Sequence, residues 1–257
     1  MSYSQRAAIY EVEYTESRDV TFVLSLLGDG ISRVIEVPCG AGRLSRHLAP
    51  RVAELHLVDL ESDMVTRATG AARGAAPDCS VHGHVQDMRL LDLNQTADLA
   101  ILPREALQLV PPEDGCRVLA AVARHIRLGG RIVVDLARFA HHGGVRDPDY
   151  FRPGHPDGVV TPDWSRALPD GGRLHRSSMQ CDEGNSLLFY LKYRLETETT
   201  QEWSSQMRIY RYDSDFLTAT VQPGLRVEHV FGGYDRSPLL FESRRMIAIY
   251  QKTSDMY

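Results

Sequence analysis

The sequence has 257 residues, of which 43% are hydrophobic and 25% are charged; this composition suits a folded chain of one large domain with an insertion and excludes a disordered chain. Its 34 acidic and 29 basic side chains give a formal net charge of -5, so a nucleic-acid partner is not expected. The longest apolar runs fall far short of the ~18 residues of a membrane span, and the amino terminus has no apolar signal core, which predicts a cytoplasmic protein without a membrane partner.

The four cysteines and ten histidines do not form a metal-binding pattern. The cysteines are widely separated, and no H-x-x-x-H or H-E-x-x-H arrangement occurs; the closest histidine groups are His82 with His84 and His141 with His142. Structural zinc sites and zincin motifs need closer ligand spacing. We therefore expect reduced thiols and no metal.

Strand and helix signals alternate in the first half of the chain. Residues 1–30 carry apolar side chains at helical spacing, which predicts an amphipathic helix. Expected strands cover 33–37, 54–58, 80–85, 97–102 and 131–135, and expected helices cover 43–49, 63–72 and 115–126. This alternation predicts a parallel, doubly wound α/β sheet.

The second half has a different character. Residues 141–172 are rich in glycine and proline and predict a long irregular segment, which is rare unless it is functional. Partly alternating stretches at 173–181, 186–197 and 203–212 predict an antiparallel meander. A short helix at 215–220 and two strands at 226–231 and 246–252 follow, and we expect these strands to pair and close the sheet.

The strongest local signal is the segment EVPCGAGR, from Glu36 to Arg43, which lies between the first buried strand and a helix. Gly40 and Gly42 let the backbone approach a ligand at the switch point of the sheet. Asp59 ends the second strand, at roughly the ~20-residue distance at which nucleotide-binding α/β proteins hold ribose hydroxyls. A chance pair of turn glycines with a surface aspartate is the structural alternative.

Two residues distinguish the expected ligand from a nicotinamide dinucleotide. The dinucleotide-binding turn expects glycine or alanine at the position that Ser45 occupies here. Glu36 would repel a pyrophosphate, whereas it suits a cationic ligand such as the methionyl ammonium of S-adenosylmethionine (SAM). An NAD(P)-dependent oxidoreductase therefore remains the alternative function.

Four motifs resemble the successive motifs of class I SAM-dependent methyltransferases over most of residues 30–140. They are Glu36 to Arg43, Asp59 with Ser62 and Met64, Gln86-Asp87-Met88, and Pro103-Arg104-Glu105. The resemblance implies that the glycine turn wraps the methionyl group, Asp59 binds the ribose, Met64 covers adenine and Asp87 reaches the adenine amine. The remainder of the chain is similar to glycine N-methyltransferase-like enzymes and to amino-sugar N-methyltransferases of antibiotic pathways.

The predicted cofactor site collects the residues of these motifs together with one tyrosine: Tyr10, Glu36, Gly40, Ala41, Gly42, Arg43, Asp59, Leu60, Met64, Asp87, Met88 and Pro103. Ligands in such sheets lie beyond the carboxyl ends of the strands, which predicts Arg104, Phe139 and Tyr234 as substrate contacts. Arg104 would hold a carboxylate or phosphate, or pair with a neighbouring acid.

The predicted catalytic residues are His141, His142 and Tyr14. An imidazole titrates near neutral pH and suits a general base; two solvated loop histidines are the alternative. Tyr10 and Tyr14 lie one helical turn apart and would close over the sulfonium, unless they only pack a helix face.

We predict an α/β protein with a Rossmann-like, doubly wound, seven-stranded, mostly parallel sheet and an antiparallel β insertion. The expected units are an amino-terminal helical cap (1–30), a SAM-binding core (31–171), a lid or dimerisation insertion (172–213), and a last helix with a hairpin that completes the sheet (214–257). The predicted function is methyl transfer from SAM to a nitrogen or oxygen of a small secondary metabolite, with S-adenosylhomocysteine (SAH) as product, by a homodimer. A protein of this fold that binds SAM for other chemistry is the second alternative.

Overall fold

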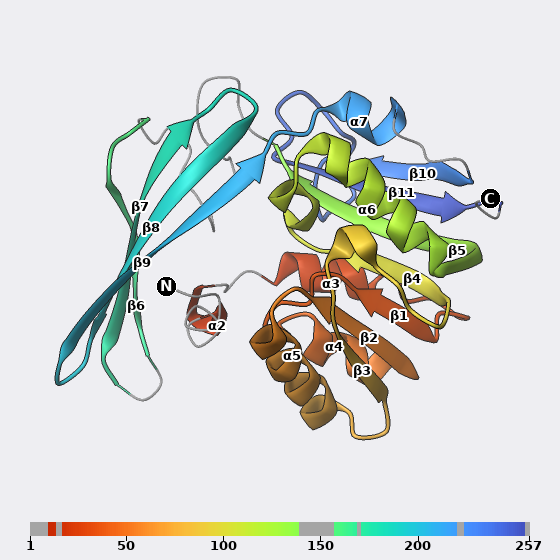
Figure 1. Ribbon diagram of the computed structural model, residues 1–257, viewed down its shortest axis with the longest axis horizontal. Coiled ribbons are helices and arrows are strands. Elements are labelled where there is room, and N and C mark those ends of the chain that lie inside the picture. Colours follow the sequence, from red (N-terminus) through yellow and green to blue (C-terminus); the bar gives the residue numbers. More distant parts are fainter. Residues whose placement is uncertain (1–9, 14–16, 139–156, 169–170, 220–223, 255–257) are drawn as a thin grey trace.

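The protein is organised around a seven-stranded sheet in a computed structural model that describes residues 10–13, 17–138, 157–168, 171–219 and 224–254 (Figure 1). In spatial order, the strands are β10 (Leu225–Phe231), β11 (Arg245–Lys252), β5 (Ile126–Ala137), β4 (Ala97–Leu102), β1 (Arg33–Glu36), β2 (Glu54–Asp59) and β3 (Ser80–Val85). The strands from β5 to β3 are parallel, and β11 runs antiparallel to both β5 and β10. The predicted doubly wound sheet and its closing hairpin are confirmed.

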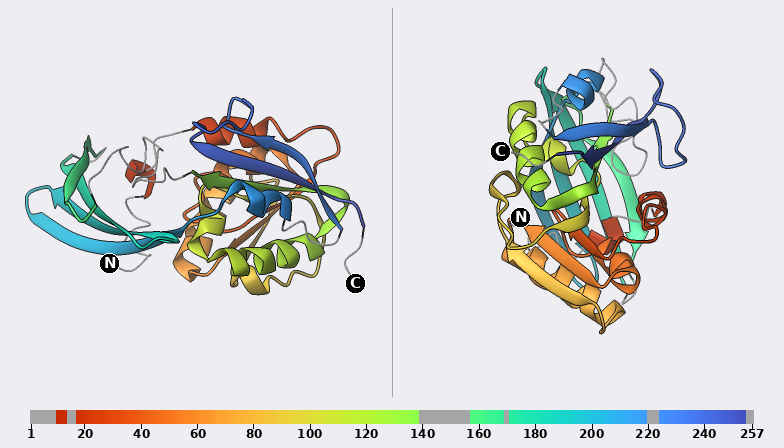
Figure 2. Two further views of the ribbon diagram at one scale, coloured as in Figure 1. Left: turned by 90° about the horizontal axis from the view of Figure 1, so that it is seen from above. Right: turned by 90° about the vertical axis from the view of Figure 1, so that its right-hand side faces the viewer.

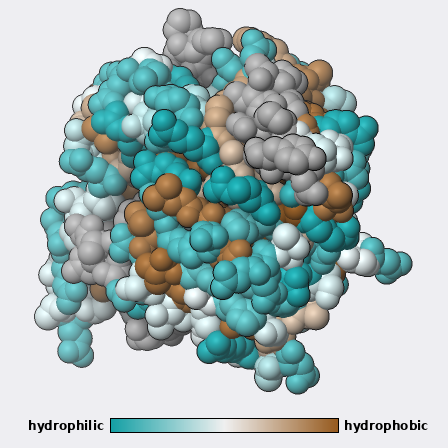
Figure 3. All heavy atoms as spheres, turned by 45° about the vertical axis from the view of Figure 1, so that its right-hand side comes forward, coloured by the Kyte–Doolittle hydropathy of each residue, from teal (hydrophilic) through white to brown (hydrophobic). Residues whose placement is uncertain are grey.

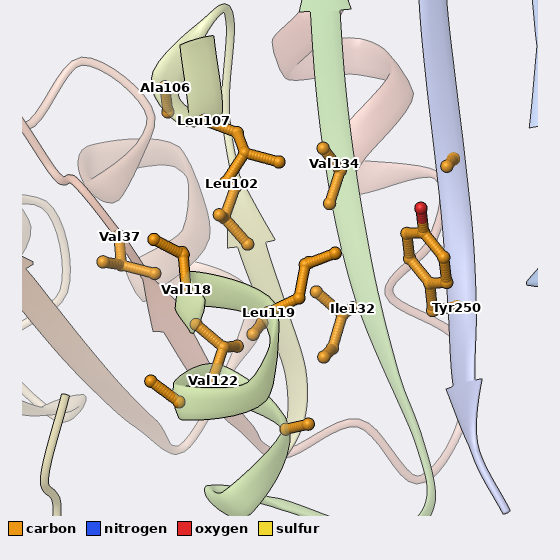
Figure 4. Packing of buried hydrophobic residues seen from close by; sticks show 14 of the residues in the cluster. Val37, Leu102, Ala106, Leu107, Val118, Leu119, Val122, Ile132, Val134 and Tyr250 are labelled. Atoms are coloured by element: carbon orange, nitrogen blue, oxygen red, sulfur yellow. The ribbon is translucent and has the colours of Figure 1, made fainter. Parts of the chain in front are cut away.

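Helices cover both faces of this sheet. One face packs against α3 (Arg18–Leu24), α4 (Ser45–Leu48) and α5 (Ser62–Ala75), and the other packs against α6 (Pro112–Arg124) and α7 (Ser214–Ala219). Short 3-10 helices cover Ala49–Arg51, Met88–Leu90 and Ala106–Leu109. Val118, Leu119 and Val122 of α6 face the apolar side chains of β4 and β5, as Figure 4 shows. Burial of such apolar area is the main driving force for folding.

A second sheet stands to one side of this core (Figures 1 and 2). Its antiparallel strands are β6 (Thr161–Ala167), β7 (Arg173–Asp182), β8 (Ser186–Glu196) and β9 (Thr200–Tyr210), in that order. Alternate residues on one face of β8, from Leu187 to Tyr193, are buried and form a separate small core with Met207 and Ile209 of β9. The predicted meander is therefore present, with one additional strand.

The sequence predicts an irregular segment over 141–172. The residues of β6 lie within this range and form a strand, so the prediction is wrong for them. Strand β6 carries Pro162, and its register shifts between Pro162 and Trp164. A proline and a bulge are tolerated at a sheet edge, where the missing N–H has no partner to lose. Because of this proline and this register shift, β6 lacks the regular alternation of apolar and polar residues by which strands are predicted from sequence.

The amino-terminal prediction of one helix over 1–30 is wrong for the described residues. They form two short helices, α2 (Tyr10–Glu13) and α3. Val20, Phe22 and Val23 of α3 pack on the seven-stranded sheet, whereas Glu13 contacts Arg176 and Tyr193 of the second sheet. The chain forms two short helices because α2 contacts the second sheet and α3 packs on the seven-stranded sheet.

On the face drawn in Figure 3, hydrophobic residues form patches between hydrophilic ones. Scattered apolar residues of this kind are ordinary on a folded domain. Within the described ranges, no helix is long and apolar enough to cross a membrane.

Candidate active site

A cavity of about 490 Å³ opens at the edge of the sheet where the parallel strands end. Its walls come from the segments that follow β1, β2, β3 and β4, and from the end of β9. The predicted site residues that line it are Glu36, Gly40, Arg43, Asp59, Leu60, Met64, Asp87, Met88, Pro103 and Arg104. Residues from four separate motifs therefore meet at one site, because the carboxyl ends of parallel strands share an edge.

The turn after β1 depends on two glycines in the left-handed region, with φ of 51° at Gly40 and 90° at Gly42. A Cβ atom on Gly42 would lie 2.6 Å from Cα of Ala68 in α5. Glycine is therefore needed there for backbone conformation and for close packing. Ala41 and Gly42, which were predicted to contact the cofactor, belong to this turn but are not among the residues that line the cavity.

Asp59 joins this turn to the end of β2. Its Oδ2 accepts a hydrogen bond from the Gly40 N–H at 2.9 Å, and its Oδ1 accepts one from the Glu61 N–H at 3.0 Å. Burial raises the pKa of the carboxyl, although these bonds favour its charged form. The carboxylate is thereby oriented at the cavity wall, where it can accept hydrogen bonds from ligand hydroxyls.

Glu36 lies deeper, at the end of β1, and is 1% exposed. Ser45 Oγ donates a hydrogen bond to its Oε2 at 2.6 Å. Burial raises the pKa of Glu36 to about 8, because the charged form loses hydration. Arg43 is paired with Asp19 at Oδ1 and Oδ2. An acid in this setting favours a cationic ligand group and disfavours a phosphate.

Asp87 and Arg89 form the wall after β3. The Asp87 carboxylate accepts hydrogen bonds from the backbone N–H, Nε and Nη2 of Arg89 at 2.9, 3.0 and 2.6 Å. This pairing lowers the pKa of Asp87 below its usual range. Both residues line the cavity beside the apolar side chain of Met88.

The wall after β4 contains two consecutive non-glycine residues in the left-handed region, Arg104 (φ 35°) and Glu105 (φ 50°). Such conformations cost ~1–3 kcal/mol each and persist where neighbouring contacts hold them. Asp135 of β5 holds this turn: its Oδ2 accepts from the Arg104 N–H at 3.2 Å and its carbonyl oxygen accepts from the Glu105 N–H at 2.9 Å.

A buried arginine completes this network. Arg245 of β11 donates from Nε to Oδ1 of Asp135 at 2.6 Å and from Nη2 to Oε1 of Glu105 at 2.7 Å. Its guanidinium lies 5.1 Å from the ring centroid of Tyr234, whose hydroxyl donates to Oδ2 of Asp135 at 2.8 Å. Tyr234 therefore supports the β4 wall and is not among the residues that line the cavity.

The second sheet contributes to the same cavity through Met207, Ile209 and Tyr210 of β9. Gln108, which is fully buried, ties β9 to the core: its Nε2 donates to the carbonyl oxygens of Tyr210 and Ala137, each at 3.1 Å. Tyr210 therefore belongs to the second sheet and also lines the cavity.

Sequence reasoning also missed Arg89, Asp135 and Arg245. Asp135 offered a signal, since it is an acid between the apolar residues 132–134 and Leu136 of a strand. Arg245 offered none, because its partners are 110 and 140 positions away in the chain.

Several predicted site residues lie outside the described residues, namely the catalytic candidates His141, His142 and Tyr14 and the substrate candidate Phe139. Tyr10 begins α2, but its side chain lies outside the description as well. Their roles stay predictions. Within the described ranges, no group of three or more His, Cys, Asp or Glu side chains is arranged to hold a metal ion.

Residues 34–130, which contain the first four walls of the cavity, match the family described as Methyltransferase domain. No curated protein matches the sequence.

Several solved methyltransferase structures share this fold over nearly their whole length. A SAM-dependent methyltransferase from Clostridium acetobutylicum has a TM-score of 0.78 at 15% identity, with 99% of this chain and 100% of that chain covered. CalS10, an amino pentose methyltransferase from Micromonospora echinaspora, has a TM-score of 0.65 at 20% identity and coverages of 98% and 92%. The sugar N-methyltransferase KedS8 from Streptoalloteichus has a TM-score of 0.68 at 18% identity and coverages of 94% and 88%.

The sheet order, the cavity at its carboxyl edge and the matched domain define the class I methyltransferase fold. As the sequence predicts, residues 34–130 match a methyltransferase domain, and the chain has the fold of SAM-dependent methyltransferases.

Proposed function

We propose that the protein transfers the methyl group of SAM to a nitrogen atom of a small molecule, and that this molecule is an amino sugar. The observation that carries the proposal is the meeting of Glu36, Gly40, Asp59 and Asp87 at one cavity within the matched methyltransferase domain. The acceptor atom and substrate class are supported by CalS10 and KedS8, whose names give an amino pentose and a sugar nitrogen.

The acceptor groups and the apolar side chains of the cavity fit SAM. In our proposal, the Gly40 turn lies against the methionyl group, and the buried Glu36 carboxylate binds its α-ammonium. Asp59 accepts hydrogen bonds from the ribose hydroxyls, and the apolar side chains of Met64 and Leu60 cover the adenine ring. Asp87 accepts a hydrogen bond from the adenine amine.

The substrate would enter between the β4 wall and β9. Arg104 is our candidate for an anionic group of the substrate, while Met207, Ile209 and Tyr210 would contact its less polar body. Tyr234 acts only indirectly in this proposal, because it is hydrogen-bonded to Asp135 behind the wall.

SAM supplies an electrophilic methyl group on a positively charged sulfonium. When an amine accepts this group, the N–C bond forms, the S–C bond breaks and the electron pair stays on sulfur. The protein has to align the amine, exclude water and accept a proton. Apolar lining residues such as Met207 and Leu109 exclude water. His141 or His142 remains the predicted proton acceptor, and Tyr14 is predicted to close over the sulfonium.

Calorimetric titration with SAM and SAH tests the cofactor assignment. We expect both to bind, and Asp59→Ala to weaken binding by about tenfold or more, because charge-assisted hydrogen bonds to the ribose are lost. Asp29→Ala, at an exposed turn far from the cavity lining, is the matched control. Unchanged affinity in Asp59→Ala would remove Asp59 from the site.

Turnover is tested by mass spectrometry of amino sugars incubated with the enzyme and SAM. A gain of one methyl group together with SAH supports the proposal. Methylation only of matched hydroxyl analogues would replace nitrogen by oxygen as the acceptor. Binding of SAM without transfer to any acceptor would favour a SAM-binding protein with other chemistry, and binding of NADH instead of SAM would restore the oxidoreductase alternative, which the matched domain does not favour.

We also propose a cytoplasmic homodimer that binds neither nucleic acid nor membranes. The proposed units are those predicted from the sequence, with the insertion starting at β6 instead of residue 172, because β6 is hydrogen-bonded to β7. Size-exclusion chromatography with light scattering tests the dimer.

A further inference from the structure

We propose that Arg89 is a positioning residue that fixes the Asp87 carboxylate so that the cavity selects a purine with an exocyclic amine over one with an oxo group. This inference rests on the proposed function, because it assumes that the base of SAM lies at Asp87.

The Asp87 carboxylate is held by three N–H groups of one residue. The backbone N–H and Nε of Arg89 donate to Oδ1 at 2.9 and 3.0 Å, and Nη2 donates to Oδ2 at 2.6 Å. A carboxylate offers about four lone-pair sites, and within the described part of the chain no other residue donates to this one. The Nε–H is shared with Oδ2, at 3.1 Å. The carboxylate is therefore held in a fixed plane at the wall of the cavity that Asp87 lines, where it can accept a hydrogen bond from a donor in the cavity.

Arg89 is itself held at its other end. Its Nη1 donates to Oδ2 of Asp114, in the first turn of α6, at 3.2 Å. Oδ1 of Asp114 accepts from Nη1 of Arg117 at 2.9 Å. The guanidinium therefore bridges the segment after β3 and helix α6, so the plane of the Asp87 carboxylate is set by two elements of the core.

The opposite charges of Asp87 and Arg89 compensate each other, so this ion pair also favours an uncharged edge of a ligand base. The guanidinium of Arg89 compensates the carboxylate of Asp87 and lowers the pKa of that carboxyl, so the group remains an acceptor without being an isolated anion. An adenine amine would donate to it. The oxo group of hypoxanthine would bring a second acceptor against the carboxylate, which is unfavourable because two acceptors cannot share a hydrogen bond.

The test compares the affinities of SAH and S-inosylhomocysteine, its hypoxanthine analogue, by calorimetry. We expect the wild-type protein to prefer SAH by about tenfold or more, as for a charge-assisted hydrogen bond. In Arg89→Gln the carboxylate is free to rotate and take up water, so the preference falls by about threefold or more. Arg117→Gln, which leaves the Arg89 contacts in place, is the matched control and keeps the wild-type preference.

The ratio of the two affinities separates positioning from general damage. A structural role for Arg89 would weaken both ligands equally and leave the ratio unchanged, which would overturn the inference. Arg89→Lys keeps the charge without the planar fork, so it should behave like Arg89→Gln; a wild-type ratio in the lysine variant would show that charge alone is sufficient and would also overturn it.

The proposed function and this inference fail in different ways. Absence of SAH binding to the folded wild-type protein would overturn the proposed function. Tight SAH binding with equal affinity for the hypoxanthine analogue would leave the cofactor assignment standing and overturn the inference. Asp87→Asn, whose amide can donate to an oxo group, should lose most of the preference for SAH.

Discussion

Binding of SAH near pH 7 is expected to release almost one proton from Glu36. Burial raises the pKa of this carboxyl from 4.5 to about 8, so it is about 0.9 protonated at pH 7 in the ligand-free protein. An α-ammonium placed beside Glu36 would favour the charged carboxylate. The proton must then leave as the ligand binds, and the apparent affinity should rise by up to about tenfold between pH 6 and 7.

Calorimetry at a single pH in buffers of different ionisation enthalpy measures this release directly, because the slope of the observed enthalpy against the buffer enthalpy is the number of protons exchanged. We expect about 0.9 protons released at pH 7 and about 0.1 at pH 9, as follows from a pKa near 8. Glu36→Gln should bind SAH more weakly and release none. A slope of zero at pH 7 in the wild-type protein, with SAH binding intact, would refute the reasoning.

The raised pKa of Glu36 also makes the stability of the folded protein depend on pH. The pKa of Glu36 is raised in the folded state, so the folded protein binds more protons than the unfolded chain between pH 4.5 and about 8. Its stabilising effect is therefore complete below pH 4.5 and is lost as pH rises through 8, with a total of about 5 kcal/mol at most.

Three further outcomes are expected from denaturant unfolding. Arg245→Met should lower the free energy of unfolding by about 3–5 kcal/mol, because it leaves two carboxylate partners buried without their cation; a loss below about 1 kcal/mol would contradict that role. Gly42→Ala should lower the free energy of unfolding by more than about 1 kcal/mol, because φ of Gly42 is 90° and the new Cβ would meet backbone. Gly70→Ala is the control: it lies in open space within α5 and should raise the free energy of unfolding by about 0.5–1 kcal/mol. Burial lowers the pKa of His56, so the unfolded chain binds the proton more tightly and the free energy of unfolding falls as pH falls below 6.5. In His56→Gln this free energy should fall less between about pH 7 and 5. An equal fall in the variant and the wild type would rule out His56 as its source.

Much of the core could be predicted because its signals are local. The expected strands at 80–85 and 97–102 coincide with β3 and β4, since each is a short run bounded by turn residues. The glycine turn and Asp59 were predictable as neighbours for the same kind of reason. Strand ends carry these residues, and the carboxyl ends of parallel strands meet at one edge.

The sequence by itself determined the class of the sheet, the position of the cavity and ten of the 25 residues that line it, because apolar periodicity, turn glycines and strand-end acids act within a few residues. Only the tertiary structure decided that Arg245 supports the β4 wall, that β6 joins the second sheet and that β9 reaches the cavity. These arrangements join residues far apart in the chain. Their stability depends on burial and hydrogen bonds that exist only after packing, so no local pattern records them.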